Sequence, residues 1–294
     1  MRFRLGLLFL LLSSSLWAQI KVVATYGYIE ALVREIGGER VVVTRLANPR
    51  WDPHFVTPKP SYIVKLRNAD LLVVNGGELE VGWLPPLIRQ SNNPSIHPGS
   101  RGYLELARGV TMIDKPLVLS RAHGDVHPDG NPHIHLDPLN IATMAGMMAA
   151  KLTEIDPAGS EAYQKRLQQF LARWEQKCAQ WQARMKPFWG AAIIEHHALF
   201  DYFLRRYGLL KVATIEPLPG ISPNAKHIAS VIAEGSKRQV KWVLLDLYHS
   251  QAEGKIVAGR IGAKAILLGH DVGSTPEQMS LETLFESIVR SFEQ

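Results

Sequence analysis

The sequence predicts an α/β protein with two parallel-sheet domains that are joined by one long rigid helix. Short β-branched segments alternate with helical segments in both halves of the chain, which is typical of βαβ units. A continuous helical pattern lies between the two halves. The chain has 294 residues, of which 46% are hydrophobic and 20% charged, so it is long enough for two domains of moderate size.

Residues 1–18 have the pattern of a cleaved secretory signal peptide. Two arginines in the first four residues precede an apolar run at 5–12, and Ala18 offers a small residue before the expected cut. The apolar run is shorter than the roughly 20 residues of a membrane span. No cysteine stands at the cleavage site. We therefore expect a secreted, periplasmic protein that is not lipid-anchored.

The composition argues against nucleic acid as a partner and against an internal disulfide. The formal charge of +6 falls to near +4 without the two arginines of the first segment, and no Lys/Arg block concentrates it. Cys178 is the only cysteine and lies in a helical pattern. We expect a monomer that does not bind nucleic acid.

Residues 19–155 are expected to form the first α/β domain. Its expected strands are β-branched or apolar runs, at 20–25, 41–46 and 71–74. Its expected helices lie at 28–36, 61–68 and 140–155. A glycine pair ends the first helix, and Ser61 is expected at the N-cap of the second. The segment 114–140 is rich in His, Asp, Gly and Pro and is expected to be a loop.

Residues 156–186 are expected to connect the domains as one helix. Apolar side chains recur there every three or four residues, at Leu167, Phe170, Leu171, Trp174, Cys178 and Trp181. At 1.5 Å per residue, such a helix is a rod about 45 Å long, which favours a rigid spine over a flexible linker. We expect Trp174, Trp181 and Trp189 to pack in the core.

Residues 187–294 resume the alternation and are expected to form the second α/β domain. Strands are expected at 191–195, 212–215, 242–246 and 265–268, and helices at 200–207, 224–236, 251–261 and 281–292. The order of elements resembles that of the first domain, but the two sequences show no convincing repeat.

Several of the eleven histidines follow directly after an expected strand, where open parallel sheets bind their ligands. His54 follows the second strand in a loop stiffened by prolines, and His197 follows the strand that ends at Glu195. His133 lies in the central loop, and His270 and Asp271 follow the last strand. Three imidazoles and one carboxylate would suit a tetrahedral Zn²⁺ ion in the cleft between the domains.

The chain resembles the metal-binding solute-binding proteins of ABC importers, in the cluster that takes up zinc or manganese. Four segments carry the resemblance, at 52–61, 131–138, 197–209 and 215–223. The second is similar to the family motif Asp-Pro-His-x-Trp-Leu-Asp-Pro, with His135 at the tryptophan position. The resemblance covers nearly all of the mature chain and implies that His54, His133 and His197 are metal ligands.

The fourth ligand is the open choice in this resemblance, because the family supplies a carboxylate after the last strand. That region here reads Gly-His-Asp-Val-Gly at 269–273. Counting back from Gly273 puts the family's aspartate on His270, and a shift of one residue puts it on Asp271. We favour Asp271 because it keeps the carboxylate, with His270 as the alternative.

Other polar residues have weaker support as functional groups. His123 and His127 lie in a short loop that could capture metal or be an ordinary polar surface, and His196 should point away from His197. His135 is expected to pack or to hydrogen-bond behind a ligand. Glu216 and Asp246 are candidate acceptors for ligand imidazoles. His97, His227 and His249 have no supporting context.

These features predict a non-enzymatic protein that captures Zn²⁺ with high affinity in the periplasm. The expected partners are an ABC-type permease with its cytoplasmic ATPase, and a periplasmic metallochaperone is a further candidate. Mn²⁺ binding in the same transporter class is the main alternative. A secreted zinc hydrolase and a protein of cell adhesion are alternatives from other functional classes. The hydrolase lacks support because the chain has no His-x-Glu-x-x-His helix.

Overall fold

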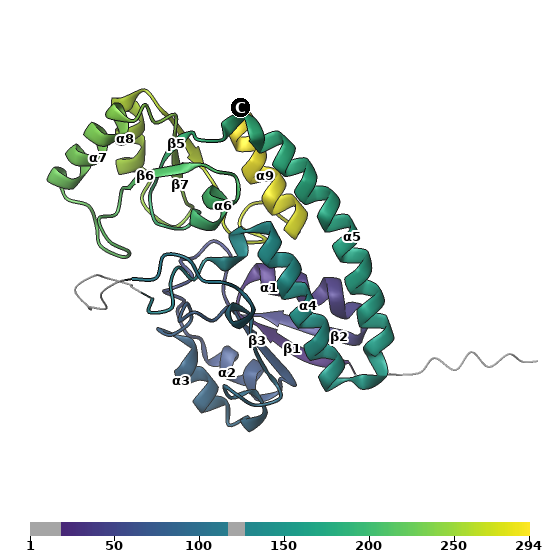
Figure 1. Ribbon diagram of the computed structural model, residues 1–294. Helices are drawn as coiled ribbons and strands as arrows, with labels where there is room; N and C mark the ends of the chain where they lie inside the picture. Colours follow the sequence, from purple (N-terminus) through teal and green to yellow (C-terminus); the bar gives the residue numbers. More distant parts are fainter. Residues whose placement is uncertain (1–18, 117–126) are drawn as a thin grey trace, which may run out of the picture.

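Two four-stranded parallel sheets, each covered by helices, form the two lobes of the computed structural model (Figure 1). The structure describes residues 19–116 and 127–294. The expected signal peptide at 1–18 and the loop residue His123 lie outside these ranges. The fold confirms the predicted class of two parallel-sheet α/β domains linked by a long helix. The domain boundaries themselves stay a prediction.

The first sheet has the strand order β2-β1-β3-β4, and all its neighbours pair in parallel. Its strands are β1 (Ile20–Ala24), β2 (Val41–Arg45), β3 (Leu71–Val74) and β4 (Tyr103–Glu105). Every residue of β3 is buried, as expected for a central strand covered on both faces. The sequence predicted the first three strands but not β4, because three residues are too few to show a pattern.

The helices of the first domain are α1 (Gly27–Gly37), α2 (Pro60–Arg67), α3 (Leu84–Ser91) and α4 (Pro138–Ile155). Helix α2 begins at Pro60, whose fixed φ suits the first turn, so the expected N-cap at Ser61 was wrong. Asp137 caps α4 by accepting a hydrogen bond of 2.9 Å from the backbone N–H of Leu139. Helix α3 was not predicted, because prolines in its first turn resemble a loop.

The second sheet repeats the topology of the first, with the parallel strand order β6-β5-β7-β8. Its strands are β5 (Ala192–Glu195), β6 (Leu210–Thr214), β7 (Trp242–Leu245) and β8 (Lys264–Leu267). Its helices are α6 (Asp201–Arg206), α7 (Ala225–Lys237), α8 (Ala252–Ile261) and α9 (Leu281–Glu293). In both lobes the carboxyl ends of the strands therefore lead into the loops that carry the candidate ligands.

Helix α5 (Ser160–Met185) runs along both lobes as the predicted spine (Figure 1). It packs against α1 and α4 of the first domain and against α9 of the second. Trp174 and Trp181 of α5 are buried and contact Phe285 of α9, with ring centroids 5.6 and 5.3 Å away. These contacts join the apolar cores of the two domains, which supports a stiff connection.

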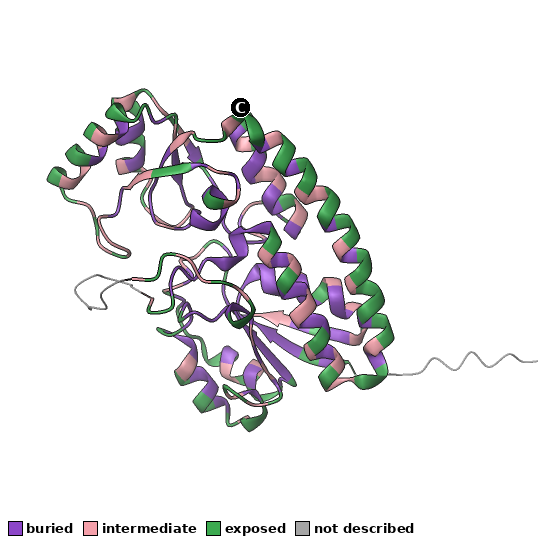
Figure 2. Cartoon of the chain, viewed as in Figure 1, coloured by how far each residue is buried: buried purple, intermediate pink, exposed green. Residues whose placement is uncertain are grey.

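The outer face of α5 is exposed along its length, whereas the central strands β1, β3, β5 and β7 are mostly buried and the edge strand β6 is not (Figure 2). Trp189, which follows α5, is 67% exposed, so the expectation that it packs in the core was wrong. Among the described residues, no helix has both the length and the apolar character to cross a membrane.

Candidate metal centre

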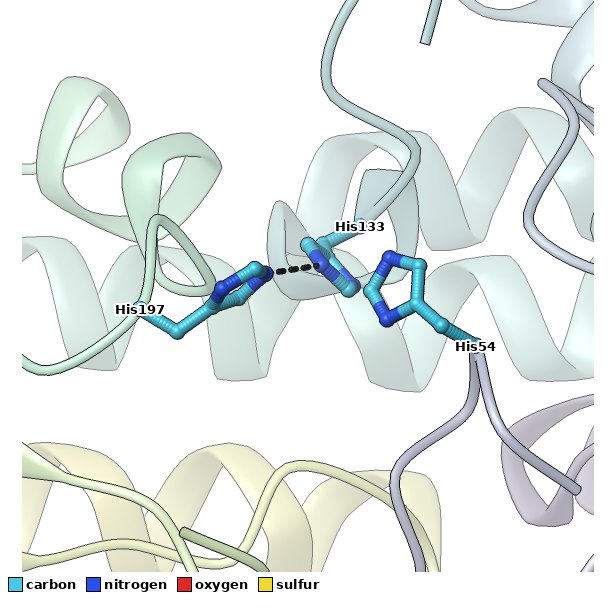
Figure 3. Close-up of side chains that lie close together, drawn as sticks. All are labelled: His54, His133 and His197. Atoms are coloured by element: carbon cyan, nitrogen blue, oxygen red, sulfur yellow. Dashed lines mark hydrogen bonds between the residues drawn. The ribbon is translucent and has the colours of Figure 1, made fainter. Parts of the chain in front are cut away.

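Three histidines from separate loops meet between the two domains. His54 comes from the loop between β2 and α2, His133 from the segment before α4, and His197 from the loop after β5. Their imidazoles point toward one another (Figure 3). Their ligand atoms all lie within 4.8 Å of one another, and His133 and His197 are buried. The structure thus brings together three of the residues that the sequence singled out.

The spacing of the imidazoles fits a tetrahedral zinc site. The Nε2 atoms of His133 and His197 are 3.3 Å apart. Two nitrogens that bind one tetrahedral Zn²⁺ at about 2.0–2.1 Å lie roughly 3.3–3.4 Å from each other. The ring of His54 lies 5.2 Å from the ring of His133 and 5.5 Å from that of His197, measured between centroids. A metal ion could therefore contact all three with small ring adjustments.

Two of the three imidazoles are held by a carboxylate on their far side. Nδ1 of His54 lies 2.8 Å from Asp52 Oδ1, and Nδ1 of His197 lies 2.7 Å from Glu216 Oε2. When each Nδ1–H donates to its carboxylate, Nε2 keeps a free lone pair directed at the other imidazoles. The sequence had marked Glu216 for this role, but it had not marked Asp52.

Next to the three histidines, Glu216 is ionised and His133 is neutral. Burial alone would raise the pKa of Glu216, but hydrogen bonds from His197 and His249 outweigh it and lower that pKa to about 2. Burial lowers the pKa of His133 well below its ordinary value, and the neighbouring His54 and His197 lower it further. His133 is therefore neutral near pH 7, the form in which an imidazole binds metal.

Hydrogen bonds fix the loops that present the histidines. The carbonyl of Pro53 accepts hydrogen bonds from Tyr26 Oη at 2.8 Å and from Trp83 Nε1 at 3.2 Å, which ties the His54 loop to the first domain. The side chain of Asn131 joins the other two loops. Its Oδ1 accepts from the backbone N–H of His133 at 2.9 Å, and its Nδ2 donates to the carbonyl of Ala198 at 2.7 Å.

The three imidazoles line a cavity of about 230 Å³ that opens to solvent. His127 lines the same cavity, and its ring centroid lies 5.2 Å from that of His54. Within the described part of the chain, its buried Nε2 has no hydrogen-bond partner. Burial, reinforced by His54 and His197, lowers the pKa of His127 to about 3. His127 is thus a neutral imidazole beside the three.

Asp271 is not brought to the three histidines. Its carboxylate accepts hydrogen bonds from the backbone N–H groups of Gly27 at 2.7 Å, Tyr28 at 2.6 Å and Val272 at 2.8 Å. Gly27 and Tyr28 open helix α1, so a carboxylate of the second domain caps a helix of the first. The sequence indicated a carboxylate after the last strand but could not tell a helix cap from a metal ligand.

His270, the alternative fourth ligand, is buried near the cluster but outside the group of three. Its ring meets Tyr248 edge-on at 5.1 Å, and its carbonyl accepts a hydrogen bond of 2.7 Å from His135 Nε2. Among the described residues, its buried Nδ1 has no partner. Burial lowers its pKa to about 4. His135 itself stacks on Tyr28 at 4.4 Å, in agreement with the packing role expected for it.

His249 is the polar residue that sequence reasoning missed. Its Nδ1 lies 2.9 Å from Asp246 Oδ2 and its Nε2 lies 3.1 Å from Glu216 Oε1. Its ring is stacked on that of His196 at 4.6 Å. A usable signal existed, because His249 and Asp246 both follow strand β7, the same relation to a strand that singled out His54 and His197.

Comparison with protein families gives one match over nearly the whole chain. The family model described as zinc-uptake complex component A, periplasmic, matches residues 22–294. This match confirms the resemblance that the four sequence segments indicated. Among curated proteins, the high-affinity zinc uptake system protein ZnuA of Bacillus subtilis is 23% identical over 264 residues, covering 88% of this chain and 81% of that protein.

Solved structures share the fold over almost the full length. A zinc-bound ZnuA lacking its residues 138–173 superposes with a TM-score of 0.79 at 24% identity, covering 93% of this chain and 96% of that one. The solute-binding protein FpvC of Pseudomonas aeruginosa, in complex with Mn²⁺, gives a TM-score of 0.78 at 22% identity, covering 94% and 99%. At these identities the similarities establish the fold, which is shared by proteins solved with different metals.

Proposed function

The chain belongs to the zinc-uptake complex component A family of periplasmic proteins, and we propose that it captures Zn²⁺ between its two domains and delivers it to an ABC-type permease. The main observation that supports this proposal is the cluster of His54, His133 and His197, whose ligand atoms lie within 4.8 Å of one another. An imidazole-rich site favours Zn²⁺, since Mn²⁺ prefers oxygen ligands. Mn²⁺ binding is the competing proposal.

The proposed ligands are His54, His133 and His197, with His270 as the fourth in place of Asp271. The carboxylate of Asp271 already accepts three backbone hydrogen bonds, and breaking them would leave buried N–H groups without partners. His270 has an unpartnered buried nitrogen, counted over the described residues, and lies where the family places its carboxylate. His127 is the second candidate, because its ring lies 5.2 Å from that of His54.

The proposed release mechanism relies on loop movement. Helix α5 packs against helices of both domains, so it should resist hinge bending. The loops of His54, His133 and His197 would then shift when the permease binds. Small-angle scattering of the mature protein should give similar profiles with and without Zn²⁺, and a large closure on zinc binding would contradict this mechanism.

The setting that we propose is periplasmic export by a cleaved signal peptide without a lipid anchor, and action as a monomer. The permease, its ATPase and a metallochaperone are the proposed partners. A hydrolase is disfavoured, because the two glutamates that would be its candidate general bases, Glu195 and Glu216, already have partners. Glu216 is hydrogen-bonded to His197 and His249, and Glu195 accepts from the backbone N–H of Phe200 and lies 3.4 Å from Lys211 Nζ.

Elemental analysis followed by competitive titration tests the proposal. The purified mature protein should carry zinc, and titration against a chelator of known affinity should find Zn²⁺ bound more tightly than Mn²⁺. His54→Ala should weaken zinc binding strongly, while His97→Ala serves as a histidine control outside the cluster. Zinc binding of His54→Ala as tight as that of the wild type would refute the site. Parallel titration of His270→Ala and His127→Ala identifies the fourth ligand.

A further inference from the structure

We propose that His196, Glu216 and His249 form a second divalent-metal site in the second domain, next to the cluster of His54, His133 and His197. The inference goes beyond the proposed transport function and does not depend on it. The three residues follow strands β5, β6 and β7 respectively, so they meet at the same edge of one sheet. Their ligand atoms all lie within 4.8 Å of one another.

Nδ1 of His249 faces a carboxylate, as it does in two residues of the cluster of His54, His133 and His197, which we call the transport site. Its Nδ1 lies 2.9 Å from the Asp246 carboxylate, as the Nδ1 atoms of His54 and His197 lie beside Asp52 and Glu216. Its Nε2 lies 3.1 Å from Glu216 Oε1. That separation is close to the roughly 3.3 Å between two ligands of a tetrahedral zinc ion. A cation bound by both atoms would take the place of the proton that they share.

His196 supplies a third donor that lacks a partner. The residue is 5% exposed, and its Nδ1 makes no hydrogen bond within the described chain. A buried polar atom without a partner is unfavourable, so it marks a place where a ligand would contribute. The ring of His196 lies 4.6 Å from that of His249 and nearly parallel to it. Binding therefore requires the His196 ring to turn its nitrogen toward Glu216.

The charge of the cluster also favours a cation. Asp246 and Glu216 are both buried, at 2% and 5% exposure. Over the described residues, the ion pairs of these two carboxylates involve only histidines, His249 with both of them and His197 with Glu216. Buried carboxylates normally pair with Lys or Arg or bind a metal ion. A proton on His249 balances one of these two charges, and a divalent cation in its place would balance both.

The donor set indicates the class of metal. Two imidazoles and one carboxylate suit Zn²⁺ and related borderline ions, and they leave one coordination position open. His249 has a side-chain exposure of 20%, so this site can exchange metal with solvent more easily than the transport site. The two sites share Glu216, which holds Nδ1 of His197 by one oxygen and faces His249 with the other.

Zinc stoichiometry tests the second site. The mature chain, without a histidine tag, is dialysed against rising concentrations of Zn²⁺, and bound metal is measured by mass spectrometry. The wild type should reach two equivalents, one tight and one at least about tenfold weaker. His196→Ala and His249→Ala should each lose the weak equivalent, and His196→Ala should keep the tight one. His54→Ala should lose the tight equivalent and keep the weak one.

Controls separate this site from its alternatives. His123→Ala should keep both equivalents, and loss of the weak equivalent in that variant would place the second metal in the central loop and overturn the proposal. A single equivalent in the wild type at saturating Zn²⁺ would also overturn it. His196→Asn, checked by circular dichroism, guards against misfolding of the alanine variant and should also lose the weak equivalent. Failure of His54→Ala to lose the tight equivalent would instead refute the transport site.

Discussion

The cluster of three histidines and the contact made by Asp271 both join the two domains. They differ in whether the polar atoms are free to bind a metal ion. At the cluster, Nδ1 of His54 and of His197 faces a carboxylate, so each Nε2 lone pair remains available. At Asp271, three backbone N–H groups occupy the carboxylate. The comparison teaches that the partners of a side chain, rather than its type, decide whether it can bind a metal ion.

The first test of this comparison substitutes one residue that should bind zinc and one that should not. His133→Ala should lower zinc affinity by at least about 100-fold, or roughly 2.7 kcal/mol, because one of the proposed imidazole ligands is lost. Asp271→Asn should change affinity less than about threefold. Competitive titration with a chelator measures both. An equal loss in the two variants would contradict the comparison.

The second test measures what Asp271 contributes to stability. Asp271→Ala leaves the N–H groups at the start of α1 without their acceptor, so the metal-free protein should lose about 2–4 kcal/mol of unfolding free energy. Urea denaturation followed by circular dichroism gives this value. Asp129→Ala, at an exposed carboxylate, should stay within about 0.5 kcal/mol of the wild type. A similar small effect for Asp271→Ala would mean that the cap contributes nothing.

The third test uses pH to follow the same carboxyl group. Burial raises the pKa of Asp271 to about 6, although its backbone hydrogen bonds oppose the shift. Since this value lies above the unfolded pKa of about 3.9, the folded state binds the proton more tightly. The group's contribution to stability is therefore full below about pH 4 and declines as pH rises toward 6, by on the order of 2–3 kcal/mol.

The pH dependence is read from a difference between two proteins. The unfolding free energy of the wild type, relative to that of Asp271→Asn, should fall between about pH 4 and 6 in the absence of metal. The comparison with the asparagine variant removes the contributions of other titrating groups, including Glu80, whose pKa burial raises to about 7. A difference that is constant across this range would show that Asp271 is ionised throughout.

The fourth test concerns the carboxylates behind the imidazoles, where the smallest effect is expected. Glu216→Gln and Asp52→Asn should each weaken the tight zinc equivalent by about 10-fold, because the amide no longer holds Nδ1–H as a carboxylate does. Isothermal titration of the tight site measures the change. Unchanged affinity in both variants would mean that these hydrogen bonds do not prepare the imidazoles for metal.

Much of the fold could be predicted because its signals are local. β-branched runs indicated strands such as β1 and β3, and apolar side chains at helical spacing indicated α5. Helix α3 was not predicted, because the prolines in its first turn are more typical of a loop. Trp189 looked like its buried neighbours on the spine but lies beyond the end of the helix, where the spacing no longer fixes its direction.

The sequence could predict only those parts of the candidate site that are located by their place in the chain, such as residues that directly follow a strand. His54, His133 and His197 meet as expected: His54 and His197 follow parallel strands, whose carboxyl ends converge, and His133 comes from the central loop. Asp271 was favoured on its chemistry, but the groups that occupy it, Gly27 and Tyr28, lie far away in the sequence. No local pattern reveals such a contact. His249 was overlooked although it follows strand β7, and only its contact with Glu216, which lies on another loop, has no local signal.

The central claim is that zinc at the tight site is bound by imidazoles and not by Asp271. X-ray absorption at the zinc edge tests it most directly, with the mature protein loaded with less than one equivalent of Zn²⁺. The account predicts the scattering of at least three imidazoles and an unchanged spectrum for Asp271→Asn. A spectrum with fewer than three imidazoles, or one in which Asp271→Asn removes an oxygen ligand, would contradict it.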